Sequence, residues 1–243
     1  MGTKKDVAEM TIWDHLGDLR KRLIIMVITV LVATVISFAF INDILQFLIK
    51  PAPGLQLIFT SPPEALTAQI RLAIQVALIG TLPLNLVQLL IFIMPALEKT
   101  EKKALLPFFL AMNLLFFLGV TFCYYLVIPF AIKFFMGFGT ESLTPLFSIG
   151  NYVSFITSLL LSFGAIFEIP LVFWFLGLMG LISSDFLRKN RKFAVLVIVI
   201  VAAIMTPPDV VSQILMSIPL LFLYEAGTLL VRLTERQKAK RAA

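Results

Sequence analysis

Long apolar runs, several of them long enough to cross a lipid bilayer, constrain this chain of 243 residues more than any other feature. Hydrophobic residues make up 60% of the sequence and charged residues only 14%, whereas a soluble domain typically carries about 25% charged residues. This excess of apolar side chains is too large for one buried core, and a membrane span needs about 20 apolar residues. The sequence therefore predicts an all-α integral membrane protein with lipid as its solvent.

Six apolar segments are predicted to cross the membrane, at about residues 23–41, 70–94, 104–132, 150–179, 193–205 and 210–231. Residues 1–243 are treated as one membrane domain, composed of an amphipathic segment (1–22), a six-span core (23–231) and a basic tail (232–243). The fifth segment gives only about 20 Å of helix, against a hydrocarbon core of about 30 Å. We therefore expect a short fifth helix, and the fold that we predict also has a short sixth helix.

Positive charge is segregated along the chain. Of the 20 Lys and Arg residues, 17 lie in the N-terminal segment, the second loop, the fourth loop and the tail, and the other three are Lys50, Arg71 and Lys133. Loops on the cytoplasmic side of a membrane protein carry an excess of Lys and Arg. The pattern predicts that both termini are cytoplasmic, and it accounts for the net charge of +6 without nucleic-acid binding.

Two acids lie where a membrane protein rarely places them. Glu168 is about 20 Å along the fourth helix from its cytoplasmic end, where an ionised carboxylate facing lipid costs several kcal/mol. Pro170 is expected to bend the helix beside it. The acid either bonds to a neighbouring helix as a structural group or has a function in a partly hydrated groove. Asp209 follows Pro207 and Pro208 in a tight turn, where it is expected to cap the sixth helix, with or without a further role.

Two further acids lie in the predicted cytoplasmic segments. Asp18 is spaced to pair with Arg22 one helical turn later, a structural role worth a few tenths of a kcal/mol. Glu101 belongs to a charged loop of a kind that is usually only solvated. Both acids nevertheless stand among basic residues, and carboxylates bind Arg through charge-assisted, often bidentate hydrogen bonds. A basic peptide is therefore an alternative partner for this pair.

The sequence carries no Gly-rich phosphate loop, metal-ligand cluster or nucleophile elbow, which are the usual signatures of nucleotide, metal and acyl-transfer chemistry. We expect no enzymatic activity, no cofactor and no metal site.

Several segments of the chain, taken together and in order, are similar to the signature segments of one family: "HLGDLRKRL", "PALEKTEKK", "FGAIFEIP", "LRKNR", "TPPDVVSQ" and "IPLLFLYEAG". They resemble TatC, the multispanning subunit of the twin-arginine protein translocase. The resemblance implies six helices that form a curved, cupped wall in a bacterial inner membrane. It also implies a receptor for signal peptides with an Arg pair, which exports folded precursors with the proton-motive force.

The resemblance assigns roles to individual positions. Glu101 and Asp18 match the two acids that contact the Arg pair, although the family usually has Glu where this chain has Asp18. Arg20 and Phe92 belong to the matched segments beside them. Glu168 and Asp209 match the polar groups of the groove and the short external turn, and four prolines match structural loop positions: Pro51, Pro170, Pro207 and Pro208. The implied partners are TatA- and TatB-type single-span proteins, membrane lipids and further copies of the chain.

Two other functions are compatible with the composition. The first is a proton-coupled secondary transporter of a small solute, with Glu168 as its proton site. Such carriers often contain inverted repeats, and residues 22–133 show no clear similarity to residues 150–231. The second is a purely structural membrane scaffold.

Overall fold

The structure is a computed structural model, and it describes residues 12–52, 57–94, 99–137, 146–205 and 210–242. Helices make up nearly all of these segments. Their bounds are α1 (Ile12–Ala39), α2 (Ile41–Ile49), α3 (Pro62–Ile93), α4 (Lys99–Phe122), α5 (Ile128–Met136), α6 (Ile149–Ile166), α7 (Ile169–Leu178), α8 (Ser184–Lys189), α9 (Arg191–Met205) and α10 (Val210–Ala242). A π-helical turn, η2 (Cys123–Val127), joins α4 to α5, and β1 (Leu57–Ile58) pairs in parallel with β2 (Phe147–Ser148).

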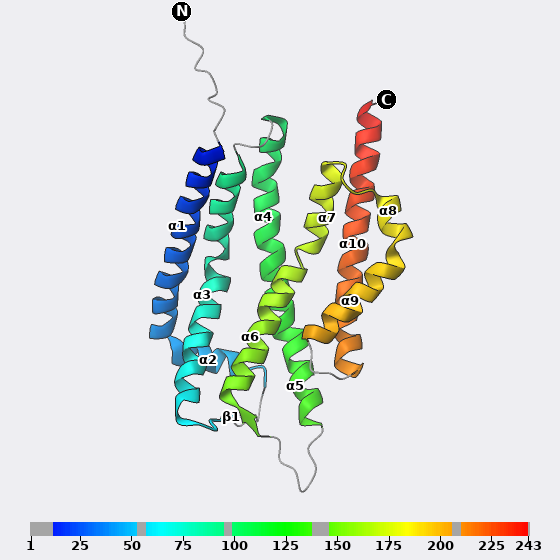
Figure 1. Cartoon of the computed structure of the whole chain (residues 1–243). Helices are drawn as coiled ribbons and strands as arrows, with labels where there is room; N and C mark the ends of the chain where they lie inside the picture. Colours follow the sequence, from blue (N-terminus) through cyan, green and yellow to red (C-terminus); the bar gives the residue numbers. More distant parts are fainter. Residues whose placement is uncertain (1–11, 53–56, 95–98, 138–145, 206–209, 243) are drawn as a thin grey trace, which may run out of the picture.

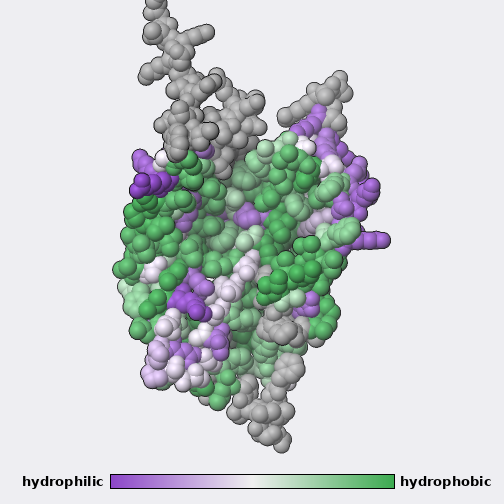
Figure 2. Space-filling view, in the orientation of Figure 1, coloured by the Kyte–Doolittle hydropathy of each residue, from purple (hydrophilic) through white to green (hydrophobic). Residues whose placement is uncertain are grey.

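The exposed surface of these helices is that of a membrane protein. Five helical segments of the described chain are long and apolar enough to cross a bilayer. Large apolar side chains point outward along them, and Val35 on α1 is 72% exposed. Figure 2 shows an apolar surface over most of one face, with polar side chains gathered toward its ends. The predicted all-α membrane fold is therefore confirmed.

The helices stand side by side as a wall (Figure 1). At one edge α1 packs on α3, in the middle α3 and α4 pack on α6, and at the other edge α7 and α9 pack on α10. The most deeply buried side chains lie in the middle of the wall, where Leu72 of α3 meets Ile156 and Phe163 of α6 in the main apolar cluster. The beginning of α1 and the end of α10 lie at the same end of the molecule (Figure 1).

The fourth predicted span is broken into α6 and α7, as Pro170 led us to expect. Proline has no N–H group to continue the hydrogen-bond ladder of α6. The backbone N–H of Glu168 instead bonds the Ala165 carbonyl at 3.1 Å, and the Glu168 carbonyl accepts the first bond of the new helix from Val172 at 2.9 Å. Pro170 is buried at the start of α7. The break therefore places Glu168 at the junction of two helices.

The fifth predicted span is short, as expected. Helix α9 has 15 residues, or about 22 Å at 1.5 Å per residue. The sixth helix is not short, and that prediction was wrong. Helix α10 has 33 residues, because the basic tail is rich in good helix formers and continues the helix. Two tail side chains also bind neighbours: Glu235 accepts the Ser184 backbone N–H at 2.9 Å, and Lys238 donates to the Leu178 carbonyl at 2.5 Å.

The segment between the first two predicted spans contains a further helix. Helix α2 is strongly amphipathic and ends just before Pro51, with Lys50 as its C-terminal cap. Two tyrosines hold it against the wall: the Tyr124 hydroxyl donates to the Phe47 carbonyl at 2.7 Å, and the Tyr152 hydroxyl donates to the Leu48 carbonyl at 2.9 Å.

Candidate functional site

The polar residues singled out near the N-terminus lie at the end of the wall where α1 begins, α3 ends and α4 begins (Figure 1). On α1, His15, Asp18 and Arg22 are three and four residues apart, which places them on one helix face. On α3, Gln88 and Phe92 are also one turn apart. These five residues form the junction of α1 with α3, which is called the α1–α3 polar junction below.

Asp18 makes the ion pair expected from its spacing. The Arg22 Nε donates to Asp18 Oδ2 at 2.8 Å, and the two side chains are 22% exposed for Asp18 and 17% exposed for Arg22. Arg22 Nη1 also donates to Gln88 Oε1, at a long 3.4 Å. A carboxylate has about four lone-pair sites, so Asp18 keeps acceptor capacity after this pairing. Arg22 thus fixes the position of the Asp18 carboxylate and leaves some of its lone pairs free to accept further hydrogen bonds.

An aromatic stack closes the same junction. The rings of His15 and Phe92 lie 4.3 Å apart between centroids, at an interplanar angle of 20°. An offset stack of this kind contributes about 0.5–1.5 kcal/mol beyond the area that it buries. The stack and the Arg22–Gln88 bond together hold the beginning of α1 against the end of α3. Phe92 is therefore placed within a helical turn of Asp18.

Glu101 lies in the first turn of α4, at the same end of the wall (Figure 1). An acid there is favoured by the partial positive charge of a helix N-terminus. Arg20 is exposed on α1, two residues from Asp18. The structure therefore brings Asp18 and Phe92 to one junction, with Arg20 on a different face of α1 and the backbone of Glu101 at the same end of the wall.

Glu168 is enclosed between helices. Both of its carboxylate oxygens are shielded from solvent, and no described residue donates a hydrogen bond to them. The backbone of Phe116 lies close by, but its N–H group is inside α4, where the helix ladder already uses it. We expected this acid either to face a partly hydrated groove or to bond a neighbouring helix. No hydrogen bond from a neighbouring helix to its carboxylate is formed among the described residues, and the groove stays a prediction.

Close helix packing explains this enclosure. A Cβ added to Gly119 of α4 would lie 2.5 Å from the Phe163 carbonyl oxygen, and one added to Gly164 of α6 would lie 2.5 Å from Cε2 of Phe116. These glycines let α4 and α6 approach until the rings interlock. Phe167, whose side chain also lies against Gly119, immediately precedes Glu168. The packing therefore holds α4 and α6 in direct contact close to Glu168.

The remaining predicted residues are placed as follows. Pro51 follows the end of α2, and Pro170 begins α7. Pro207, Pro208 and Asp209 lie outside the described residues.

Sequence reasoning missed one strongly bound acid at the opposite end of the wall. Glu64, at the start of α3, accepts hydrogen bonds from the Thr60 backbone N–H at 2.5 Å, the Thr60 hydroxyl at 2.7 Å and the Gly150 backbone N–H at 3.0 Å. It also accepts one from the hydroxyl of Ser148. These bonds join the two external segments that carry β1 and β2. The local pattern Thr-Ser-Pro-Pro-Glu is typical of a helix start, but Ser148 and Gly150 come from 84 and 86 residues away.

The α1–α3 polar junction also contained partners that the sequence alone did not indicate. Gln88 and His15 were not assigned to this contact, although their spacing from Phe92 and Asp18 is helical. Chemically, the junction presents a fixed carboxylate near an aromatic ring. Such a carboxylate is suited to accept a guanidinium group in a charge-assisted hydrogen bond.

Comparison with known proteins gives one consistent result. The family model described as "Sec-independent protein translocase protein (TatC)" matches residues 14–219. A TatC protein of Helicobacter pylori is 42% identical over 219 residues, which are 90% of this chain and 88% of that protein. A TatC protein of Aquifex aeolicus is 39% identical over 235 residues, which are 94% of this chain and 98% of that protein.

Solved structures agree with the sequence comparison. A crystal structure of a twin arginine translocase receptor TatC has a TM-score of 0.77 and 39% sequence identity, and the match covers 90% of this chain and 98% of that one. A second crystal structure of such a receptor has a TM-score of 0.79 at the same identity. The similarity therefore extends over nearly the whole chain in both sequence and fold.

Proposed function

Because this chain belongs to the TatC family of Sec-independent protein translocase proteins, we propose that it is the receptor of a twin-arginine translocase and binds the Arg–Arg signal peptide of folded precursors. The observation that carries the proposal is the family match over residues 14–219 together with a fixed carboxylate in the α1–α3 polar junction. The protein is a multi-pass membrane protein that takes part in protein translocation. Its role is binding, without catalysis.

Asp18 and Glu101 are the proposed acceptors of the two guanidinium groups. Asp18 is held by Arg22 through one oxygen, which leaves lone pairs for a second guanidinium group. Asp is shorter than Glu by one methylene, and the fixed position of α1 on α3 compensates by presenting this carboxylate beside Phe92. Glu101, at the start of α4, supplies the second charge. Arg20 and Phe92 are proposed to contact the bound peptide on either side of these acids.

The proposed setting follows from the charge pattern and the family. The end that carries Asp18, Glu101 and the basic end of α10 faces the cytoplasm of a bacterial cell, where signal peptides arrive, and both termini lie there. Other Tat subunits assemble with this chain. We propose that these are TatA- and TatB-type single-span proteins and further copies of this chain, and that the proton-motive force drives export.

Glu168 is proposed to act in a state other than the enclosed one. Its carboxylate accepts no hydrogen bond from the described residues. The acid therefore does not stabilise the fold in this state. Separation of α4 from α6 gives the acid access to polar groups of the signal peptide or of a partner helix. Asp209 and the prolines at positions 207 and 208 are proposed to shape the external turn.

Site-specific photo-crosslinking tests the proposal. A photoreactive residue at position 18 or 101 is expected to crosslink to a twin-arginine signal peptide in membranes. Phe59 is an exposed residue at the opposite end of the wall, and a photoreactive residue there serves as the matched control that gives no crosslink. Glu101→Ala is expected to abolish export while the protein still accumulates in the membrane. Normal export by this variant would remove Glu101 from the proposed site.

A further inference from the structure

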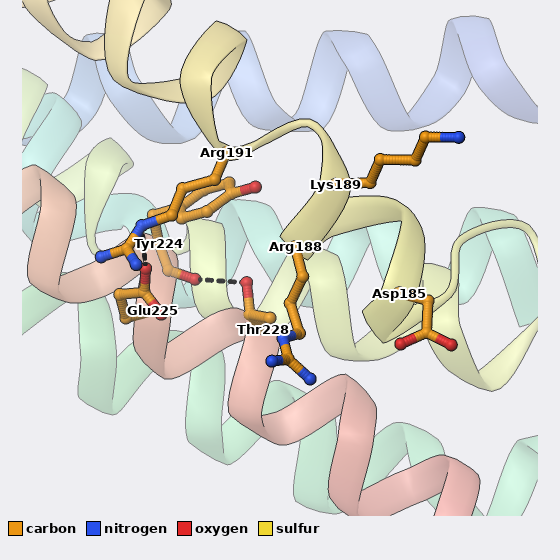
Figure 3. A pocket seen from close by; sticks show the side chains of 7 residues that line it. All are labelled: Asp185, Arg188, Lys189, Arg191, Tyr224, Glu225 and Thr228. Atoms are coloured by element: carbon orange, nitrogen blue, oxygen red, sulfur yellow. Dashed lines mark hydrogen bonds and ion pairs between the residues drawn. The ribbon is translucent and has the colours of Figure 1, made fainter.

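A charged pocket separate from the α1–α3 polar junction lies at the other edge of the wall. It has a volume of about 410 Å³ and is lined by seven residues of α8, the start of α9 and α10: Asp185, Arg188, Lys189, Arg191, Tyr224, Glu225 and Thr228. Figure 3 shows these side chains around the turn that leads from α8 into α9, directly over α10. The lining brings together three cations and two acids.

The three cations of this pocket differ in whether a carboxylate pairs with them. Arg191 Nε pairs with Glu225 Oε1 at 2.8 Å. No described carboxylate lies within ion-pair distance of the Arg188 guanidinium group, which points toward α10 near Thr228 (Figure 3). Lys189 extends away from the other two cations (Figure 3). Arg188 therefore presents its donors to the pocket while the neighbouring cation is already neutralised.

The polar floor of the pocket does not use these donors. The Tyr224 hydroxyl donates to the Leu187 carbonyl at 2.7 Å, and the Thr228 hydroxyl donates to the Tyr224 carbonyl at 3.0 Å. Both hydroxyl groups thus fix α10 and the α8 turn rather than compensate Arg188. A guanidinium group with free planar donors matches the oxygens of a phosphate group in a bidentate manner.

The surroundings of the pocket are those of a membrane interface. Glu225 shares one face of α10 with Ile218, Phe222 and Leu229, which are three to seven residues away, and all three are exposed, Phe222 by 74%. Phe186, two residues before Arg188, is also exposed. Exposed apolar side chains next to Arg and Lys, whose charged ends can reach the interface, are typical of a membrane protein surface near the lipid headgroups. The pocket thus lies beside an exposed apolar stripe of α10 that an acyl chain can follow.

We propose that this pocket binds the phosphate group of an anionic phospholipid, with Arg188 as its main ligand and the apolar stripe of α10 in contact with an acyl chain. A lipid fits both the cation and the stripe, whereas a soluble anion uses the cation alone and an acidic protein segment leaves the stripe uncovered. The site is independent of signal-peptide binding, because it shares no residue with the α1–α3 polar junction.

Native mass spectrometry of the full-length chain tests the site. The protein is released from detergent micelles that contain equal amounts of phosphatidylglycerol and phosphatidylcholine, and the ratio of the two retained lipids is measured. Arg188→Gln is expected to lower the phosphatidylglycerol preference by about tenfold or more, as for the loss of a hydrogen bond to a charged group. Lys192→Gln removes one charge from the same segment outside the pocket, and is expected to lower it by about fivefold at most.

Further arms identify the ligand and control for folding. Arg188→Lys keeps the charge without the planar donor pair and is expected to fall between the wild type and Arg188→Gln. Excess inorganic phosphate, or a Glu-rich peptide, is expected not to displace the lipid. Displacement by phosphate would assign the pocket to a soluble anion, and displacement by the peptide would assign it to an acidic protein. Either result, or an equal loss of preference in Arg188→Gln and Lys192→Gln, overturns the proposal.

Discussion

Replacing Glu168 with an apolar residue of similar size is expected to stabilise the protein. Both carboxylate oxygens are shielded from solvent without a hydrogen-bond donor among the described residues. Leaving a buried polar group unsatisfied costs about 1–3 kcal/mol, and this cost disappears when an apolar group fills the same space. Glu168→Leu is therefore expected to raise the free energy of unfolding by about 1–3 kcal/mol. For a chain of this size, each kcal/mol corresponds to about 2–4 °C in Tm.

Thermal unfolding of the purified chain in detergent measures this change. Glu225→Leu is the matched control, because Glu225 is also an acid in a predicted span but is 47% exposed and paired with Arg191. The control is expected to change the free energy of unfolding by less than about 1 kcal/mol, as is usual for an exposed ion pair. Export by Glu168→Leu is expected to be lost although the protein is more stable. A variant less stable than the control would mean that the carboxylate holds the fold through a partner, which refutes the reasoning.

Two further substitutions test the packing of the wall. Gly119→Ala is expected to lower the free energy of unfolding by about 1–3 kcal/mol through overpacking, because its Cβ would lie 2.5 Å from the Phe163 carbonyl oxygen. Gly80→Ala is the control: its Cβ would have nothing within 4 Å, so the change is expected to be neutral or stabilising. Unfolding of both variants by SDS titration measures the difference. Tyr152→Phe is expected to lower the free energy of unfolding by about 1 kcal/mol, because it removes the hydrogen bond to the Leu48 carbonyl. Protease cleavage in the loop that contains α2 is expected to increase. An unchanged cleavage rate would argue against this anchoring of α2.

The sequence predicted the features that depend on local chemistry. Apolar runs predicted the membrane helices, Pro170 predicted the break before α7, and helical spacing predicted the Asp18–Arg22 pair. Each of these depends on residues within a few positions of one another, where helix geometry and proline stereochemistry fix the outcome.

The features that were not predicted depend on residues far apart in the chain. Glu64 is held by Ser148, which is 84 residues later. A short sixth helix was expected before the basic tail, but Glu235 of the tail binds Ser184 across 51 residues and helps to extend α10. Glu168 was expected either to bond a neighbouring helix or to lie in a partly hydrated groove, and next to the close contact of α4 with α6 its carboxylate has no hydrogen-bond partner among the described residues. No local pattern encodes which distant helix packs against a given face.

The most direct test of the receptor assignment is the affinity of the purified chain for a twin-arginine signal peptide, compared with the variant that carries both Asp18→Asn and Glu101→Gln. Removing one partner of a close charge pair commonly costs about 2–5 kcal/mol, so the double variant is expected to bind at least about thirtyfold more weakly. A peptide with Lys–Lys in place of Arg–Arg is expected to bind the wild-type chain weakly as well. Equal affinity of the wild type and the double variant for the Arg–Arg peptide would contradict the account.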